Sequence, residues 1–255
     1  MIAIRYENKV AVLMYHDISD NESLYAISPA KFGAHLALLG ASGYRFISAE
    51  ALYGFVMQNK PVPDNAVLIT FDDGYASFYR HAYPILQSYG AVAACFLIVG
   101  YVNPQRKAGY LSWDEVREMK SRGFGFYSHS YCSHEPRIGY QGKPVNPLTN
   151  RLFLPQQRRL ETEAEYVRRV KSDLLAAEET LRSELGNELS MLCFPHGIYN
   201  RRLIEIGDEL GISLYFTGEE GLNPPHSRLI RRINAGSVQI TPQRLLTILQ
   251  TLSSL

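Results

Sequence analysis

Apolar runs of strand length recur along the chain and alternate with more polar segments. Most of these runs are continuous in hydrophobicity, as expected for parallel strands that are covered on both faces. The predicted strands are VAVLMY (10–15), RFIS (45–48), AVLITF (66–71), VAACFLIV (92–99), GFGFYS (123–128), LSMLCF (189–194), ISLYF (212–216) and RLIRRI (228–233).

The segments between these runs carry helix-start signals. A proline at the first helical position, or Ser/Thr followed three residues later by Glu, marks such a start. The signals are Ser28-Pro29, the capping boxes that begin at Ser112 and Thr162, and Thr241-Pro242. This alternation, without repeats or a break in composition, predicts one α/β domain over residues 1–255. Seven or eight strands favour a barrel over an open sheet.

One segment, at about 135–161, interrupts this alternation. Four prolines, at 136, 144, 147 and 155, lie in or beside it, and it has no clear periodicity. A loop this long inside a compact domain is usually functional or disordered. We therefore predict a long loop insertion here.

Composition excludes several classes of protein. Hydrophobic residues make up 46% and charged residues 20% of the 255 residues, which excludes a disordered or coiled-coil chain. The net charge of +1 argues against a protein whose main role is nucleic-acid binding. No run approaches the ~18 apolar residues of a spanning helix, and the N-terminal MIAIRYENK lacks a signal-peptide pattern. The sequence is thus compatible with a cytoplasmic protein or with a mature chain after signal removal.

Candidate chemistry follows three of the predicted strands. Asp72-Asp73 comes directly after AVLITF, His129 and His134 follow GFGFYS, and His16 follows VAVLMY. Each feature alone has an ordinary interpretation as a turn, a helix cap or a loop histidine. Strand ends of a barrel meet at one face, so together they predict one site. Neutral imidazoles and a carboxylate, with positions left for water, suit a catalytic metal site.

These residues resemble a known family. Thr70-Phe71-Asp72-Asp73-Gly74, the two later histidines and Phe194-Pro195-His196-Gly197 are similar to the motifs of the polysaccharide deacetylases, the family-4 carbohydrate esterases. The resemblance implies a distorted (β/α)7 barrel that removes acetyl groups from N-acetylated sugars with a divalent metal. It implies Asp72 as the general base and Asp73, His129 and His134 as metal ligands.

The chain departs from the family pattern in ways that resemble one branch. The two histidines are one residue further apart than in His-x-x-x-His, and Cys132 lies between them. Leu13-Met14-Tyr15-His16 is similar to the family's C-terminal Leu-x-His motif moved to the front. Both features resemble the circularly permuted deacetylases of biofilm poly-N-acetylglucosamine. His16 is then the expected general acid, ahead of His196 and His226, and a thiolate ligand role for Cys132 is the less favoured alternative.

The arginine of the family's third motif is absent, since the sequence there is Cys193-Phe194-Pro195-His196. Arg231 or Arg232 is the alternative source of an arginine that orients Asp72, although either is also compatible with a solvent-facing position. We predict Tyr75, His196 and Arg232 as substrate contacts.

The resemblance implies a hydrolytic mechanism. A divalent ion, Zn²⁺ first and Co²⁺ or Ni²⁺ as alternatives, would lower the pKa of water and polarise the acetamide. Asp72 would accept the water proton, a backbone N–H near Gly74-Tyr75 would contact the oxyanion, and His16 would protonate the departing nitrogen.

The segment 136–160 has a second predicted role. It carries five basic residues and no acidic residue, beside the apolar run Leu152-Phe153-Leu154. This combination predicts peripheral contact with an anionic membrane through the 136–160 loop. The alternatives are that the three side chains pack onto the barrel, or that the loop walls the substrate groove.

The favoured function is metal-dependent de-N-acetylation of poly-β-1,6-N-acetyl-D-glucosamine exopolysaccharide in biofilm formation. Chitin oligomers or peptidoglycan are the alternative substrates, and a non-catalytic carbohydrate-binding relic is the alternative from another class. The favoured function implies a location outside the cell or at its surface, peripherally associated with the membrane. No nucleic-acid partner is expected.

Overall fold

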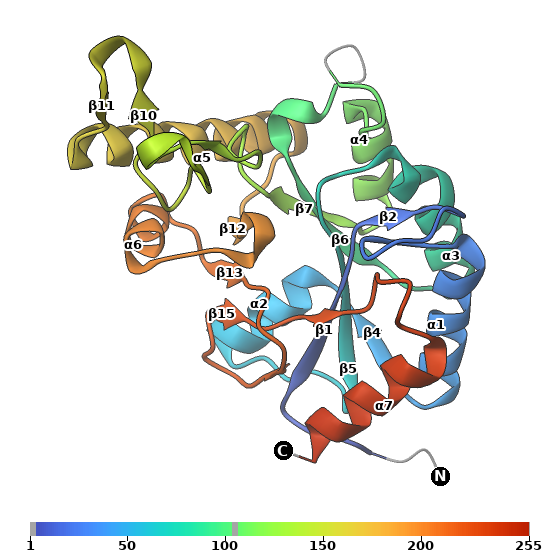
Figure 1. The fold of residues 1–255 in the computed structure, drawn as a ribbon. Helices are drawn as coiled ribbons and strands as arrows, with labels where there is room; N and C mark the ends of the chain where they lie inside the picture. The colour runs from blue at the N-terminus through green and yellow to red at the C-terminus, as the bar shows by residue number, and fades with distance from the viewer. Residues whose placement is uncertain (1–3, 104–106, 255) are drawn as a thin grey trace.

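The computed structural model describes residues 4–103 and 107–254, in which strands and helices alternate (Figure 1). The predicted domain 1–255 includes residues 1–3, 104–106 and 255, which lie outside the described residues. The main sheet contains β1 (Val10–Tyr15), β4 (Arg45–Ile47), β5 (Ala66–Phe71), β6 (Ala93–Leu97), β7 (Gly125–Ser128), β12 (Met191–Cys193), β13 (Leu214–Phe216), β14 (Leu222–Asn223), β15 (Leu229–Ile230) and β16 (Ile233–Asn234). The α-helices are α1 (Pro29–Ala41), α2 (Ala49–Gln58), α3 (Tyr83–Ser88), α4 (Trp113–Ser121), α5 (Glu163–Leu185), α6 (Arg201–Glu209) and α7 (Pro242–Ser253).

The predicted helix starts are confirmed in detail. Ser28 and Thr241 cap α1 and α7 with their side chains, and the capping boxes at Ser112 and Thr162 are both formed. No helix in the described part of the chain is long and apolar enough to cross a bilayer.

The main sheet is a nearly closed barrel. Its strands follow the order β14-β1-β5-β6-β7-β12-β13-β15, with β4 paired to β5 and β16 to β1. All pairs are parallel except β14 with β1. The predicted α/β barrel is therefore confirmed.

The last predicted strand, RLIRRI, closes the barrel in two pieces. Leu229 and Ile230 form β15 beside β13, whereas Ile233 and Asn234 form β16 beside β1. The interruption lets one segment join both edges of the sheet. The first and last strands are thus neighbours, as a circular permutation of the barrel requires.

Side-chain alternation explains why the strand runs are continuously apolar. Alternate residues of five strands form a common buried cluster: Val10, Val12, Ala66, Leu68, Ala94, Phe96, Met191, Cys193, Leu214 and Phe216. The intervening residues of β1, β5 and β6, such as Val67 and Ile69, belong to a second cluster with residues of α1, α3 and α7. Because successive side chains of a strand point to opposite faces, both faces are buried and both must be apolar.

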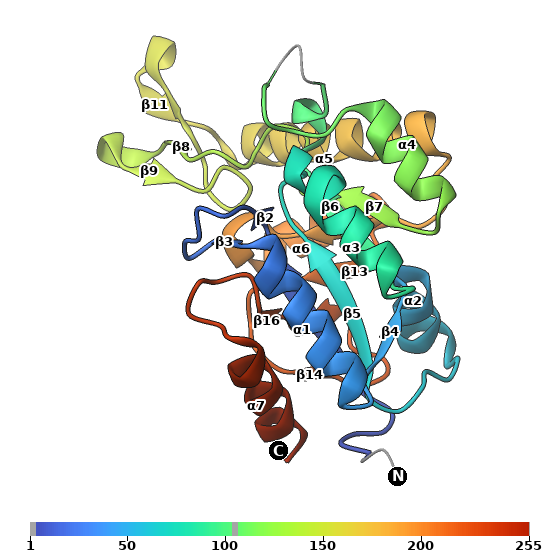
Figure 2. The ribbon, with the colours of Figure 1, turned by 90° about the vertical axis from the view of Figure 1, so that its right-hand side faces the viewer.

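The segment at 135–161 is more regular than predicted. It forms two short antiparallel hairpins, β8 (Arg137–Ile138) with β9 (Pro144–Val145), and β10 (Phe153–Leu154) with β11 (Arg159–Leu160). They project on the same side of the barrel as the short parallel pair β2 (Asp17–Ile18) and β3 (Ala26–Ile27) (Figure 2).

Glu178 on α5 makes the free energy of unfolding depend on pH. Burial raises its pKa to about 7, and the nearby Ser190 hydroxyl and Arg182 offset only part of this rise. Below the pKa that Glu178 has in the unfolded chain, its carboxyl group is protonated in both the folded and the unfolded protein. As the pH rises from about 4.5 through 7, only the unfolded chain ionises freely, so the folded state loses up to ~3 kcal/mol relative to it.

We therefore expect Glu178→Gln to raise the free energy of unfolding above that of the unmodified protein at pH 8, with the difference shrinking toward pH 4. Denaturant titrations at both pH values measure this. The exposed neighbour Glu179, replaced by Gln, is the control and should show little change. A Glu178→Gln difference that is constant with pH would contradict the assignment.

Candidate active site

The alternation that fills the barrel interior continues into a cluster of polar residues at the carboxyl ends of the strands. On β1, Val10, Val12 and then His16 share a parity, and on β5, Ala66, Leu68 and then Asp72 do so. His129 lies two residues beyond the interior-facing Tyr127, and Arg232 two beyond Ile230. The strands therefore direct these four polar side chains to one place.

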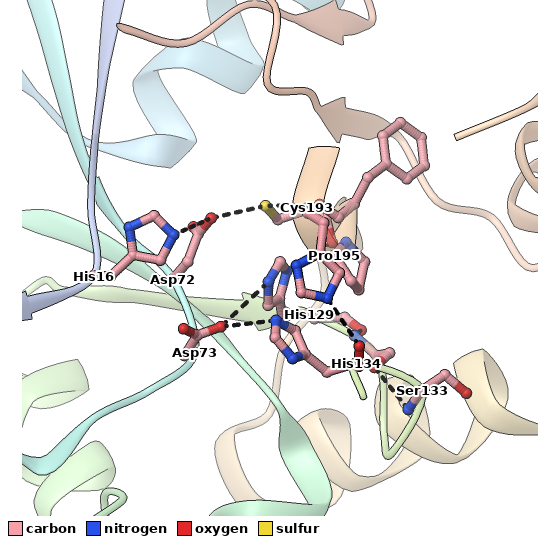
Figure 3. A network of polar contacts seen from close by, with 12 residues as sticks. His16, Asp72, Asp73, His129, Ser133, His134, Cys193 and Pro195 are labelled. Atoms are coloured by element: carbon pink, nitrogen blue, oxygen red, sulfur yellow. Dashed lines mark hydrogen bonds and ion pairs between the residues drawn. The ribbon is translucent and has the colours of Figure 1, made fainter. Parts of the chain in front are cut away.

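Asp73, His129 and His134 converge within this cluster (Figure 3). Asp73 Oδ1 lies 3.5 Å from His129 Nε2 and 3.3 Å from His134 Nε2, and the three atoms lie within 4.8 Å of one another. Asp73 Oδ1 is buried and has no hydrogen-bond partner among the described residues. His129 Nδ1 donates to the Cys193 carbonyl oxygen at 2.9 Å, which leaves the Nε2 lone pair directed at Asp73. These residues fit a divalent metal ion.

The ionisation states agree with that fit. Burial lowers the pKa of His129 to about 4, so its imidazole is neutral at pH 7. Burial alone would raise the pKa of Asp73, but His134 and His129 hold it below its usual value. A neutral imidazole and an ionised carboxylate are the donor forms that borderline divalent ions bind.

Asp72 is held by Arg232. The guanidinium donates from its two terminal nitrogens to the Asp72 carboxylate at 2.7 and 2.9 Å, and both side chains are almost completely buried. Burial alone would raise the pKa of Asp72, but the charge and hydrogen bonds of Arg232 hold it far below its usual range. Cys193 Sγ adds a weak contact to Asp72 at 3.5 Å.

Arg232, which the sequence analysis predicted as a substrate contact and as a possible partner of Asp72, makes the second of these contacts and lines the cavity. Its Nε–H donates to the Thr217 carbonyl oxygen at 2.9 Å, which further fixes the guanidinium beside Asp72. Arg231, the sequence alternative, instead lies 4.0 Å from Glu219. Arg232 thus stands where it orients Asp72.

His16 lies on the opposite side of Asp72 from Cys193 (Figure 3). Its Nε2 is 3.9 Å from Asp72 Oδ2, and its Nδ1 is buried without a partner among the described residues. His196 is exposed and donates from Nε2 to the His134 carbonyl oxygen at 3.1 Å. His226 is bonded through its backbone to Val56 of α2, outside this cluster.

Backbone strain occurs at and beside the cluster, as it does at several turns elsewhere in the described chain. Asp73, Ser130 and His196 adopt positive φ angles of 73°, 75° and 58°, a conformation that non-glycine residues seldom adopt. The turn at Asp73 separates the two adjacent carboxylates, so that Asp72 contacts Arg232 while Asp73 faces the histidines. Strain of this kind is retained where surrounding structure enforces it, typically at functional sites.

The cluster opens into a cavity of about 500 Å³. Its lining includes every residue predicted for catalysis, metal binding or substrate contact, among them Tyr75 and His196. Tyr75 is half-buried and stacks on Tyr110 with ring centroids 5.2 Å apart. The arrangement provides an ionised carboxylate, a metal-binding triad and a partly exposed imidazole around one space.

Comparison with known proteins identifies the family of the chain. The sequence profile described as polysaccharide deacetylase matches residues 59–215, more than half of the chain. The chain belongs to the polysaccharide deacetylase family. The strand end with Asp72-Asp73 and the loop with His129 and His134 both fall within the matched range.

Relatives of the chain share this family. It is 29% identical over 235 residues to the poly-β-1,6-N-acetyl-D-glucosamine N-deacetylase of Escherichia coli (strain K12), which covers 84% of this chain and 34% of the relative. It is 23% identical over 206 residues to the enzyme of the same name from Staphylococcus aureus (strain N315), covering 80% of this chain and 64% of the relative. The chain thus spans about a third of the first relative's length and less than two thirds of the second's.

Solved structures of family members have the same fold. A de-N-acetylase from Aggregatibacter actinomycetemcomitans superposes with a TM-score of 0.87 at 22% identity, over 94% of this chain and 99% of that one. The IcaB protein of Ammonifex degensii superposes with a TM-score of 0.79 at 26% identity, over 95% and 97%. The distorted (β/α)7 barrel implied by the sequence resemblance is confirmed.

One residue beside this site was missed by the sequence analysis. Asp173 on α5 accepts hydrogen bonds from the backbone N–H of Tyr131 at 2.9 Å and of Cys132 at 3.0 Å, and from Ser133 Oγ at 2.8 Å. It thereby fixes the loop between His129 and His134, including its extra residue. Cys132 lies in this loop and is not part of the ligand cluster found among the described residues.

We expect Asp173→Ala to weaken divalent-metal binding about 10- to 100-fold, the usual cost of losing a residue that orients metal ligands. Calorimetric titration of Zn²⁺ into chelator-stripped protein measures this. Glu179→Ala, on the exposed face of the same helix, should leave the affinity unchanged. Unaltered affinity in a folded Asp173→Ala protein would contradict the role.

The predicted membrane residues are not fully exposed. Leu152, Phe153 and Leu154 are half-buried at the start of the β10–β11 hairpin, whose base is fixed by the buried Glu161. Of the five basic residues counted there, Arg159 is paired with Glu165 at 2.7 and 2.8 Å. The three apolar side chains are therefore partly covered, and one of the five positive charges is neutralised by an ion pair.

Proposed function

We propose that this chain hydrolyses the acetamide of N-acetylglucosamine residues in a polysaccharide. The single observation that carries the proposal is the pairing of two adjacent carboxylates with different partners, Asp72 with Arg232 and Asp73 with the two histidines. One carboxylate is thus kept ionised for proton transfer while its neighbour is available as a metal ligand. A binding relic would have no need for this division.

The chain's own residues can divide the reaction between them. A divalent ion held by Asp73, His129 and His134 would supply Lewis acidity and a water of lowered pKa. Asp72, held by Arg232, accepts the proton of the attacking water. His16, which lies on the opposite side of Asp72 from Cys193, donates a proton to the departing amine nitrogen.

A backbone donor is available for the developing oxyanion. Of the two amides considered from the sequence, the Gly74 N–H donates to the Asp72 carbonyl oxygen at 2.9 Å and is thus occupied. The Tyr75 N–H has no acceptor among the described residues, and Tyr75 lines the cavity. We therefore assign the oxyanion contact to the Tyr75 N–H.

The favoured substrate is poly-β-1,6-N-acetyl-D-glucosamine, in biofilm formation, with Zn²⁺ as the favoured ion and Co²⁺ or Ni²⁺ as alternatives. The names of the Escherichia coli and Staphylococcus aureus relatives support this substrate. The mixed nitrogen and oxygen donor set supports the metals. Chitin oligomers and peptidoglycan are the alternative substrates.

Amine release tests the proposal directly. β-1,6-linked and β-1,4-linked N-acetylglucosamine oligomers and peptidoglycan are incubated with the protein, with and without a chelator. We expect chelator-sensitive release that is greatest with the β-1,6 oligomer. Greater release from the β-1,4 oligomer or peptidoglycan would select an alternative substrate, and binding without release would support the relic.

We also propose that the protein acts outside the cell or at its surface, with peripheral contact to an anionic membrane through the 136–160 loop. Exposed basic side chains support this contact, at Arg137, Lys143, Arg151 and Arg158. On the β8–β9 hairpin, Ile138 and Tyr140 are also 58% and 64% exposed. Each basic residue near such a surface contributes about 1 kcal/mol, which suffices for reversible binding only.

Replacing Leu152, Phe153 and Leu154 by Ser is expected to reduce co-sedimentation with anionic vesicles and to leave hydrolysis of short soluble oligomers intact. Because the three side chains are half-buried, thermal unfolding must accompany the binding assay. Loss of oligomer hydrolysis with intact vesicle binding would make the segment a substrate wall. An unstable variant would show that the three side chains stabilise the fold.

A further inference from the structure

One wall of the cavity has no role in the metal site or in the acid–base pair. It is formed by Met14 of β1, Asn234 of β16 and Tyr25 of the β2–β3 segment. Met14 and Asn234 are register partners in the parallel pair β1–β16. Gly236 lets the chain after β16 lie against β1, since a Cβ there would lie 2.9 Å from Tyr15 Cα.

Tyr25 is exposed although its backbone is firmly held. Its N–H donates to Ser23 Oγ at 3.1 Å, and its carbonyl oxygen accepts from the Asp17 N–H at 3.1 Å. Asp17 directly follows His16, so this bond ties Tyr25 to the active-site strand. The side chain is nevertheless 64% exposed.

The rest of the segment is anchored on both sides of Tyr25. The Ser23 carbonyl oxygen accepts from the Val238 N–H at 2.7 Å. Glu22 accepts from Ser28 N and Oγ at 3.0 and 2.8 Å and from Lys31 Nζ at 2.6 Å. These contacts hold the backbone that presents the aromatic ring of Tyr25 beside the cavity.

Tyr25 and Asn234 offer complementary chemistry. The Tyr25 ring packs edge-on against His16, with ring centroids 5.5 Å apart and an interplanar angle of 73°. The Asn234 side chain is exposed and has no hydrogen-bond partner among the described residues. An aromatic ring stacks on the apolar face of a pyranose, and an amide both donates to and accepts from hydroxyl groups.

We propose that Tyr25 and Asn234 form a sugar subsite for the residue next to the N-acetylglucosamine that is hydrolysed. This inference rests on the proposed function, which places the reacting acetamide by Asp72 and Asp73. His16 lies between Asp72 and Tyr25, so the subsite is one step away from the reacting acetamide. It therefore receives the neighbouring sugar of the polymer. The enzyme should then distinguish an oligomer from a small acetylated compound.

The test compares four variants with the unmodified enzyme. Tyr25→Ala and Asn234→Ala remove the two contacts, Tyr25→Phe keeps the ring, and Tyr89→Ala is the control. Tyr89, at the end of α3, is 44% exposed and does not line the cavity. KM and kcat are measured for amine release from a β-1,6-linked N-acetylglucosamine tetramer and for hydrolysis of a small acetyl ester, and tetramer binding is measured by calorimetry.

Tyr25→Ala should raise KM and the dissociation constant for the tetramer about tenfold, the factor that corresponds to one aromatic stacking contact. Tyr25→Phe and Tyr89→Ala should stay near the unmodified enzyme, and kcat for the small ester should not change. Asn234→Ala should also raise KM and the dissociation constant for the tetramer.

Two results would overturn the subsite. One is tetramer binding by Tyr25→Ala that equals binding by Tyr89→Ala. The other is an equal fall of kcat for ester and tetramer, which would show that Tyr25 acts by positioning His16. If the unmodified enzyme binds the tetramer without releasing amine, the proposed function fails, while the binding comparison still decides the subsite.

Discussion

Replacing Asp72 with Asn is expected to lower turnover by a factor of about 10²–10⁴ while the metal stays bound. The amide cannot accept the proton of the attacking water, whereas Asp73 and the two histidines keep their places as ligands. Amine release and metal titration on the same preparation measure both halves of this expectation. Near-normal turnover, or loss of the metal, would contradict the assignment of the base.

Two further measurements make this result interpretable. Asp72→Asn leaves the buried charge of Arg232 without its counterion, so the free energy of unfolding must be measured alongside. His16→Ala should also lower turnover by about 10²–10⁴ if His16 is the general acid. A near-normal rate in that variant would transfer the role to His196, which lines the same cavity, or remove it.

Asp73→Ala is expected to lose metal and activity together. Its Oδ1 faces both histidines, so removal of the carboxylate leaves only two imidazole donors. In the unmodified protein, metal at 100 times its dissociation constant should stabilise the fold by about 2.7 kcal/mol, and the variant should lose this gain. Thermal unfolding with and without Zn²⁺ measures it.

The control for Asp73→Ala is Asp114→Ala, which removes an exposed carboxylate of α4. It should keep both the metal-induced stabilisation and the turnover. An Asp73→Ala protein that still gains stability from Zn²⁺ would show that the ion binds elsewhere.

The strands were predictable because a barrel strand is buried on both faces. AVLITF, for instance, is buried at every position, and its continuous hydrophobicity marks it in the sequence. The same regularity locates the site, since a polar residue directly after such a run lies at the carboxyl end of the strand. His16, Asp72 and His129 could be brought together by this reasoning alone.

The features that escaped prediction depend on contacts between distant parts of the chain. Asp173 binds a loop about forty residues away, at Tyr131 and Cys132, and no local pattern records such a bond. RLIRRI reads as one strand because periodicity does not show that its two halves pair with β13 and β1.

The same limit applies to the segment 136–160, which reads as an irregular basic loop. Its charge count does not show that Arg159 is paired with Glu165. Nor does the run of apolar residues show that Phe153 and Leu154 pair with Leu160 and Arg159.

A crystal of the protein soaked with Zn²⁺ and measured at the zinc absorption edge tests the central claim most directly. The account predicts one anomalous peak in the cavity, within about 2.0–2.2 Å of one oxygen of Asp73 and of His129 Nε2 and His134 Nε2, with Asp72 still on Arg232. A peak at another place, or a peak that lacks any of these three ligands, would contradict it.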